Sequence, residues 1–219
     1  MSNRYHRYLD IPNYIPNFDP SRWNTDGYRW LEFHKELTFE DFGNSKIEPW
    51  LNSLNMTSDW ISLWYTPPGE DGIIHSDNTE GQDWAKIIFQ YGAKGSTMRW
   101  WSSTNVANCS TSIKEMILES NQSEIGKQVA ESGYEEKDRT IDNYHGRIIA
   151  SRNEDATLLY EAEISNASLA NVGILHSSHN PTDERRFVIT IALYDLQTDE
   201  RILWDDAYQR LSHYIKKTL

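Results

Sequence analysis

Short segments of strand-forming residues, separated by turn-forming residues, recur along most of this chain of 219 residues. They are rich in β-branched and aromatic residues, which favour extended backbone, and most end at a polar, glycine or proline cluster. The clearest strand prediction covers 186–194 (RFVITIALY), and the others cover 35–42, 60–66, 73–77, 84–91, 96–102, 148–149, 156–164 and 169–176. Such a series, with few helices, predicts a mainly β fold: a sandwich or a jelly-roll barrel with flanking helices.

The length of the chain fits a single domain, 1–219, with a sizeable core. We expect 1–55 to form an N-terminal arm and support, irregular over 1–30 because prolines recur there. The β-barrel core should cover 60–195, with a strongly charged insertion at about 120–155. Short helices are predicted at 48–54 and 112–119, and a C-terminal helix within 198–219.

The overall charge and the single cysteine exclude several kinds of protein. The net charge of −12 argues against nucleic acid as a partner, because phosphate contacts need clustered Lys and Arg. Cys109 is the only cysteine, which excludes an internal disulfide framework and is typical of a reducing cytosol. No signal peptide or membrane-spanning run is visible. We therefore expect a cytoplasmic protein without a membrane partner, whose oligomeric state stays open.

The segment 72–78 (GIIHSDN) joins an apolar pair to a histidine and an aspartate two residues apart. In an extended chain, side chains at i and i+2 point to the same face. His75 and Asp77 should therefore project together at the end of a strand. They would supply two of the three ligands of a facial site with two histidines and one carboxylate, the kind that binds Fe(II). Alone, the pattern His-x-Asp has low specificity.

A second histidine and a cation follow downstream. His176 closes the predicted strand before the last, and Arg186 opens the last one. His179, in a predicted turn, is the alternative to His176. Arg185 is the alternative to Arg186, since neighbours on a strand point to opposite faces, and the spacing from His176 favours Arg186.

The ordered set His75-x-Asp77, His176 and Arg186 resembles the signature of the Fe(II)/2-oxoglutarate-dependent oxygenases. Their fold is a double-stranded β-helix, which is a jelly-roll barrel of the cupin type. The segment 176–187 (HSSHNPTDERRF) is similar to the distal-histidine segment of the aspartyl/asparaginyl and prolyl hydroxylase-like branches. The resemblance covers residues 60–195.

This resemblance implies that His75, Asp77 and His176 bind Fe(II), and that Arg186 pairs with the far carboxylate of 2-oxoglutarate. The protein would then be a 2-oxoglutarate-dependent dioxygenase that hydroxylates a C–H bond of an amino-acid-like or protein side-chain substrate. Lys86 and Arg99, on earlier predicted strands, are fallback anchors for the cosubstrate, because some members of the family use a basic residue there.

Aromatic rings on the predicted strands are candidates for contacts with a substrate, although core packing is the more frequent role of such rings. The preferred candidates are Trp84, Tyr91 and Trp101. Two other functions stay open at this point. One is a cupin-type metalloenzyme that does not use 2-oxoglutarate. The other is a non-enzymatic jelly-roll module for binding or structure, in which the histidines are merely packed.

Overall fold

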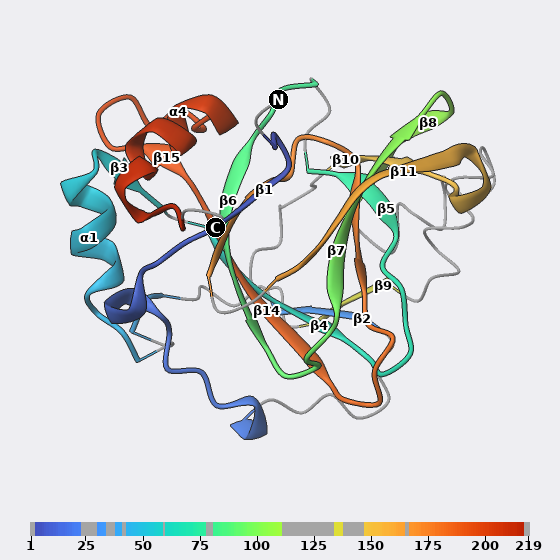
Figure 1. Cartoon of the computed structure of the whole chain (residues 1–219), viewed down its shortest axis with the longest axis horizontal. Coiled ribbons are helices and arrows are strands. Elements are labelled where there is room, and N and C mark those ends of the chain that lie inside the picture. Colours follow the sequence, from blue (N-terminus) through green and yellow to red (C-terminus); the bar gives the residue numbers. More distant parts are fainter. Residues whose placement is uncertain are drawn as a thin grey trace.

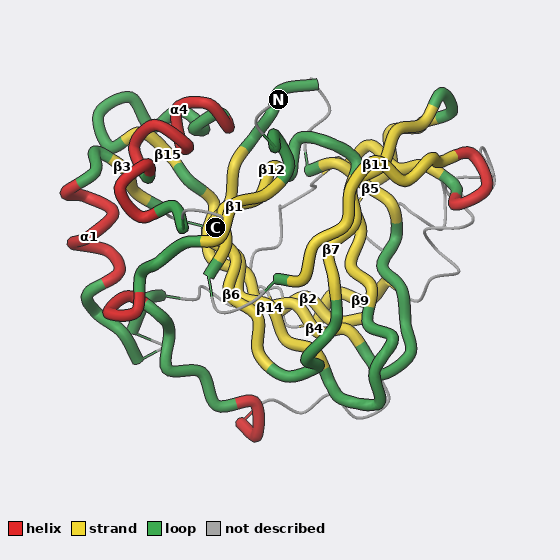
Figure 2. The backbone as a smooth tube through the Cα atoms, in the orientation of Figure 1, coloured by secondary structure: helices red, strands yellow, loops and turns green. Residues whose placement is uncertain are grey.

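The structure is a computed structural model that describes residues 3–22, 30–33, 38–40, 43–58, 60–77, 81–110, 134–137, 147–164 and 167–216. Strands dominate it, and both described α-helices lie toward one side, whereas the short 3-10 helix Asn153–Asp155 lies on the other (Figure 2). The larger sheet has the order β1 (His6–Tyr8), β12 (Ser168–Asn171), β6 (Ala85–Tyr91), β14 (Arg186–Ala192), β4 (Ile61–Thr66), β2 (Trp30–Phe33) and β9 (Tyr134–Lys137). The smaller sheet has the order β11 (Ala156–Glu163), β7 (Thr97–Ser103), β13 (His176–His179), β5 (Ile74–Ser76), β10 (Arg147–Ser151) and β8 (Val106–Ser110). A two-stranded ribbon pairs β15 (Tyr194–Asp195) with β3 (Met56–Thr57).

Eight of these strands are divided between the two sheets, and from one of the eight to the next the chain changes sheet at every step except from β7 to β11. The larger sheet contains the order β12-β6-β14-β4, and the smaller sheet contains β11-β7-β13-β5. Each strand therefore pairs with strands that are not its sequence neighbours, and all of these pairs are antiparallel. This interleaving is that of a jelly roll, or double-stranded β-helix. The predicted fold class is confirmed.

The strands β12, β6, β14 and β4 of the larger sheet are largely buried on both faces. The outer face of this sheet packs against α1 (Ile47–Ser53) and α4 (Trp204–Arg210) through Phe187, Ile189 and other apolar residues of one core cluster. Figure 1 shows both helices on that side of the molecule. Its inner face meets the smaller sheet through a second cluster that includes Val188. Because both faces are covered, the sequence of β14 after Arg186 is apolar except for Thr190 instead of alternating.

The N-terminal prediction needs a correction. Residues 1–30 were expected to be irregular, but His6–Tyr8 forms β1 and pairs with β12 at the edge of the larger sheet. The edge of the barrel offers unpaired backbone groups, which a short polar segment can complete. Of the predicted strand 35–42, the described residues 38–40 are not extended. The strand that lies beside β4 is Trp30–Phe33 instead.

The predicted strand 169–176 is in fact two strands in different sheets. β12 ends at Asn171 in the larger sheet, and β13 begins at His176 in the smaller one. The chain crosses between the sheets at Gly173. A Cβ on Gly173 would lie 1.9 Å from the carbonyl oxygen of Gln82, so this crossing requires glycine. Pairing with β7 and β5 makes the polar sequence HSSH a strand, which the sequence had predicted to be a turn from Ser177 onward.

The C-terminal prediction is too long. α4 covers Trp204–Arg210 and is followed by a 3-10 turn at Ser212–Tyr214. Before it, Arg201 and Leu203 form bridges to Tyr194 and Trp84, which keeps the chain extended. The predicted helix 112–119 and most of the predicted insertion lie outside the described residues. None of the helices in the described ranges is long and apolar enough to cross a membrane.

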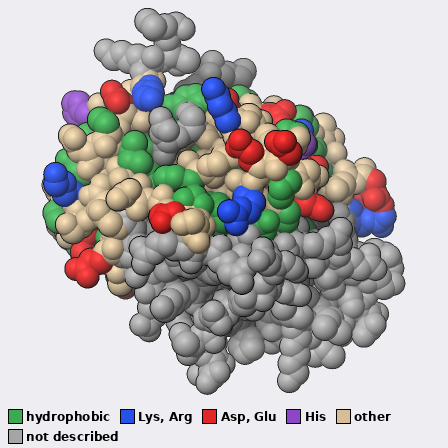
Figure 3. All heavy atoms as spheres, turned by 90° about the horizontal axis from the view of Figure 1, so that it is seen from below, with side chains coloured by type: hydrophobic (Ala, Val, Ile, Leu, Met, Phe, Trp, Pro, Cys, Tyr) green, Lys and Arg blue, Asp and Glu red, His purple; other side chains and the backbone are tan. Residues whose placement is uncertain are grey.

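Acidic and basic side chains alternate over the described part of the face in Figure 3, without a continuous basic patch there. The described part of that face therefore offers no continuous positive surface for a phosphate backbone.

Candidate metal centre

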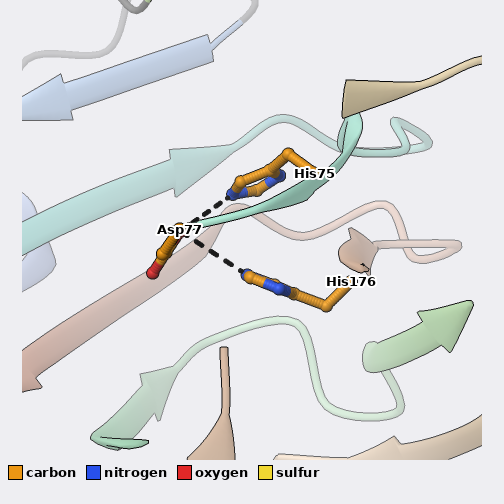
Figure 4. A group of neighbouring side chains, drawn as sticks. All are labelled: His75, Asp77 and His176. Carbon is orange, nitrogen blue, oxygen red and sulfur yellow. Dashed lines mark ion pairs between the residues drawn. The ribbon is translucent and has the colours of Figure 1, made fainter. Parts of the chain in front are cut away.

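His75, Asp77 and His176 come together between the two sheets. β5 and β13 pair so that His75 lies directly opposite His176, and their ring centroids are 4.5 Å apart. Asp77 follows β5, and its Oδ1 lies 3.4 Å from Nε2 of His75 and 3.9 Å from Nε2 of His176. One ligand atom from each of the three lies within 4.8 Å of the others. Figure 4 shows the three side chains pointing toward one another.

The position of Asp77 is held by the crossing segment between β12 and β13. The backbone N–H of Asp77 donates to the carbonyl oxygen of Val172 at 3.0 Å. The hydroxyl of Ser76 donates to the carbonyl oxygen of Gly173 at 2.8 Å. The end of β5 is therefore tied to the crossing segment that leads into β13, and the expected shared orientation of His75 and Asp77 is present.

Both histidines are oriented by the same backbone contact. Nδ1 of His75 lies 3.0 Å from the carbonyl oxygen of Ile73, and Nδ1 of His176 lies 2.9 Å from that of Ile174. A carbonyl oxygen only accepts, so each Nδ1 carries the proton and donates it. Each Nε2 is then left with a lone pair, and both face Asp77. A metal ligand needs this tautomer, with the second nitrogen held by a hydrogen bond.

The charges in the centre favour a cation. Burial, with a smaller effect of the neighbouring His75, lowers the pKa of His176 to about 3, so its ring is neutral near neutral pH. Burial alone would raise the pKa of Asp77, but Lys86 is the main opposing influence, and this pKa lies well below the usual value. Two nitrogen lone pairs and an ionised carboxylate thus converge on one point, which is the donor set for a divalent transition metal.

Lys86 is a member of the site that the sequence interpretation placed only among fallback anchors. It lies on β6, on the inner face shared with Ile88, and its Nζ is 2.6 Å from Oδ2 of Asp77. No pattern in the sequence relates Lys86 to Asp77, because the contact joins the two sheets. Arg99, the other fallback anchor, lies on β7 next to the inward-facing Trp100 and pairs with Glu161 at 2.8 Å instead.

Arg186 is buried, with 4% of its surface exposed, whereas Arg185 is exposed and lies over the ring of Phe187. Nε of Arg186 donates to Oε1 of Gln90 at 3.0 Å, and Nη1 donates to Oγ1 of Thr66 at 3.5 Å. Burial lowers its pKa to about 10. Within the described residues, no ion pair joins Arg186 to a carboxylate.

Gln90 marks the position of Arg186 relative to the metal centre. Lys86 and Gln90 point to the same face of β6, four residues and therefore roughly 13 Å apart. The buried guanidinium consequently lies beside the opposite end of β6 from the pair of Lys86 and Asp77. The two cations therefore occupy different positions along one inner face.

His179, the alternative third ligand, lies away from the centre. It is on β13 and not in a turn, three residues after His176, and so faces the outside of the smaller sheet. Its Nδ1 contacts Oδ1 of Asp71. The structure therefore brings His176, and not His179, toward His75 and Asp77.

The three aromatic candidates for substrate contact lie in different places. Trp84 precedes β6 on the side of Lys86, is half-buried, and stacks on the guanidinium of Arg201 at 4.8 Å. Tyr91 faces the opposite side of the larger sheet, where its hydroxyl donates to the carbonyl oxygen of Pro16. Trp101 faces away from the inward-pointing Trp100 and donates to Ser177. Only Trp84 is oriented toward the barrel interior.

The fold and this site define a jelly-roll protein with a candidate metal centre between its sheets. No protein-family model matches the chain, and no curated protein sequence matches it. Among solved structures, it is similar to ycfD of E. coli, with 12% identity and a TM-score of 0.31 over 67% of this chain and 28% of that one. It is also similar to EvdO2 from Micromonospora carbonacea var. aurantiaca, solved in complex with 2-oxoglutarate, with 10% identity and a TM-score of 0.28 over 67% of this chain and 56% of that one. The match thus spans less than two thirds of each of these two solved chains. Because both TM-scores are low, the likeness carries no functional argument, and the function is argued from the site.

Proposed function

We propose that the protein is an Fe(II)- and 2-oxoglutarate-dependent dioxygenase that hydroxylates a C–H bond of an amino-acid-like or protein side-chain substrate. The observation that carries this proposal is the convergence of His75, Asp77 and His176 inside a jelly-roll barrel. Two histidines and one carboxylate are the ligand set of non-haem Fe(II) oxygenases, and they leave coordination positions open on the other side of the metal.

The residues present fit the metal. His75 and His176 each present an unprotonated Nε2, and Asp77 presents Oδ1 toward both. The side chains of His75 and Asp77 are 18% and 15% exposed, whereas that of His176 is 8% exposed. A substrate would therefore approach from the side of His75 and Asp77, while His176 forms the closed side of the centre.

Arg186 supports the assignment of the cosubstrate. Within the described residues its hydrogen bonds go to neutral partners, and such a buried guanidinium is well suited to a carboxylate, because it donates in a fixed, two-pronged geometry. Its place on the same inner face as Lys86, farther along β6, suits a dicarboxylate whose other end would lie at the metal. Gln90 and Thr66 would orient the guanidinium. When bound, iron, 2-oxoglutarate and dioxygen would supply hydroxylation of a C–H bond coupled to decarboxylation of the cosubstrate.

Single-residue variants with metal analysis test the centre. We expect His75→Ala and His176→Ala to lose stoichiometric Fe(II) or Ni(II), because each removes one of three protein ligands. His179→Ala is the matched control, since this histidine lies on the same strand but faces outward, and it should keep the metal. Equal metal content in all three variants would contradict the proposed ligands.

The cosubstrate is tested separately. The iron-loaded protein should convert 2-oxoglutarate to succinate, and Arg186→Ala should weaken 2-oxoglutarate binding by about tenfold to a hundredfold, in line with the loss of a charge-assisted pair. Arg185→Ala, which changes the exposed neighbour, should leave it unchanged. Stoichiometric metal without binding of 2-oxoglutarate would point to a cupin-type metalloenzyme, and absence of metal would point to a non-enzymatic module.

A further inference from the structure

Lys86 contacts one of the two oxygens of the Asp77 carboxylate. Its ammonium lies 2.6 Å from Oδ2, while Oδ1 is the oxygen that faces the two imidazoles. The side chains of Lys86 and Asp77 are only 11% and 15% exposed, so solvent screens the pair weakly. Among the described residues, the carboxylate that pairs with Lys86 is that of Asp77. One oxygen is thereby left for a metal, which favours ligation through a single oxygen atom.

The charge of the centre follows from this arrangement. Imidazoles that ligate a metal carry no charge, so two of them, one carboxylate and one ammonium sum to zero. A divalent cation would therefore leave two uncompensated positive charges in a partly buried space, and the buried guanidinium of Arg186 is a further positive charge on the same inner face. Without Lys86, the carboxylate would cancel one of those two charges. The negative charge of Asp77, which would normally offset part of the charge of the metal, is consequently already neutralised by Lys86.

We propose that Lys86 is a positioning residue that makes metal binding depend on a bound dianion of the dicarboxylate class. This inference rests on the proposed function and deepens it. The metal alone binds weakly, because Lys86 repels it and holds one oxygen of its carboxylate ligand. A dianion on the open side of the metal offsets the two excess positive charges of the centre itself, and the attraction of these charges strengthens its binding. By linkage, the metal raises the affinity for the dianion by the factor by which the dianion raises the affinity for the metal.

The test measures Co(II) binding to metal-free protein by calorimetry and by the visible absorption of Co(II), with and without N-oxalylglycine, an inert dicarboxylate. In the wild type, we expect N-oxalylglycine to raise Co(II) affinity by at least about tenfold, the size of a typical coupling between two sites. In Lys86→Met, Co(II) alone should bind about threefold to tenfold more tightly, and the effect of N-oxalylglycine should fall to about threefold or less.

Two further variants make the result specific to the charge at this position. Lys86→Arg keeps the positive charge and should keep the coupling between Co(II) and N-oxalylglycine. If Lys86 acted through packing alone, the larger arginine would not be expected to preserve this coupling. Lys94→Met removes a charge from an exposed lysine and should behave as the wild type. If Lys86→Met does not fold, Lys86→Gln carries the same expectation.

The outcomes separate this inference from the proposed function. Cooperative binding in the wild type that persists unchanged in Lys86→Met, or weaker binding of Co(II) alone in that variant, would overturn the role of Lys86 and leave the metal centre in place. A wild-type protein that binds no divalent metal would overturn both.

Discussion

Among single residues, His6 shows that a buried histidine in this protein need not be a ligand. It is 2% exposed, its Nε2 lies 2.9 Å from the hydroxyl of Ser168, and its ring packs edge-on against Tyr8. Burial, with a smaller effect of Arg7, lowers the pKa of His6 to about 4. It lacks the convergent acceptors that surround His75 and His176, so its chemistry is that of a packed, neutral ring.

The low pKa of His6 predicts loss of stability in mild acid. Between pH 6.5 and about 4 the unfolded chain binds a proton at this residue that the native protein does not bind, so stability falls as the pH falls through this window. The contribution of His6 reaches about 2–3 kcal/mol near pH 4.5. We expect His6→Gln, which keeps a polar partner for Ser168, to lose correspondingly less between pH 7 and pH 4.5. Urea unfolding at the two pH values measures this, and an equal acid loss in both proteins would disprove it.

At the scale of elements, the crossing from β12 to β13 matters most for the site. Val172 and Gly173 accept the hydrogen bonds that position Asp77 and Ser76, and His176 begins the strand that follows. The crossing passes so close to the segment before β6 that a Cβ on Gly173 would lie 2.6 Å from the backbone nitrogen of Trp84. The ligands of the centre thus depend on a backbone contact that tolerates no side chain.

Gly173→Ala should therefore damage both the fold and the centre. The new methyl group meets backbone atoms, so the crossing must shift, and we expect a loss of about 2–3 kcal/mol in the free energy of unfolding together with weaker Ni(II) binding. Gly69→Ala is the control, since no atom lies within 4 Å of its added Cβ. Its positive φ of 73° should cost about 1 kcal/mol without changing metal affinity. Chemical denaturation and calorimetry measure the two effects, and unchanged metal affinity in Gly173→Ala would show that the crossing does not position Asp77.

At the scale of the whole molecule, the centre joins the two sheets of the barrel. His75 and His176 come from the smaller sheet, whereas Lys86, which holds Asp77, comes from the larger one. A ligand that binds only when these parts are assembled stabilises the native state against the unfolded chain by mass action.

Metal binding should therefore raise the melting temperature of the protein. With free Ni(II) and N-oxalylglycine at about a hundred times the dissociation constant of the metal, the stabilisation is about 2.7 kcal/mol, or about 5–10 °C for a chain of this size. A chelator should reverse the shift, and His75→Ala should not show it. Scanning calorimetry measures the change, and an equal shift in His75→Ala would place the metal elsewhere.

Much of the local structure could be predicted from the sequence. The strand-forming segments at 60–66, 84–91 and 186–194 are β4, β6 and β14 within a few residues, because β-branched and aromatic residues favour extended backbone wherever they lie. The shared orientation of His75 and Asp77 was predictable as well, since alternation along a strand is a property of the backbone itself. The errors at β1, at the crossing at Gly173 and in the polar strand HSSH arose where pairing with distant strands outweighs local preference, and the predicted strand 35–42 and the length of the C-terminal helix were wrong as well.

The sequence by itself therefore determined the fold class and half of the candidate site. Only the tertiary structure decided that His176 and not His179 lies opposite His75, that Arg186 is buried while Arg185 is exposed, and that Lys86 reaches Asp77. The physical reason is the range of the interactions. Strand propensity and alternation arise within a few residues, whereas register and the contact between two sheets depend on how all the strands of the barrel pair at once.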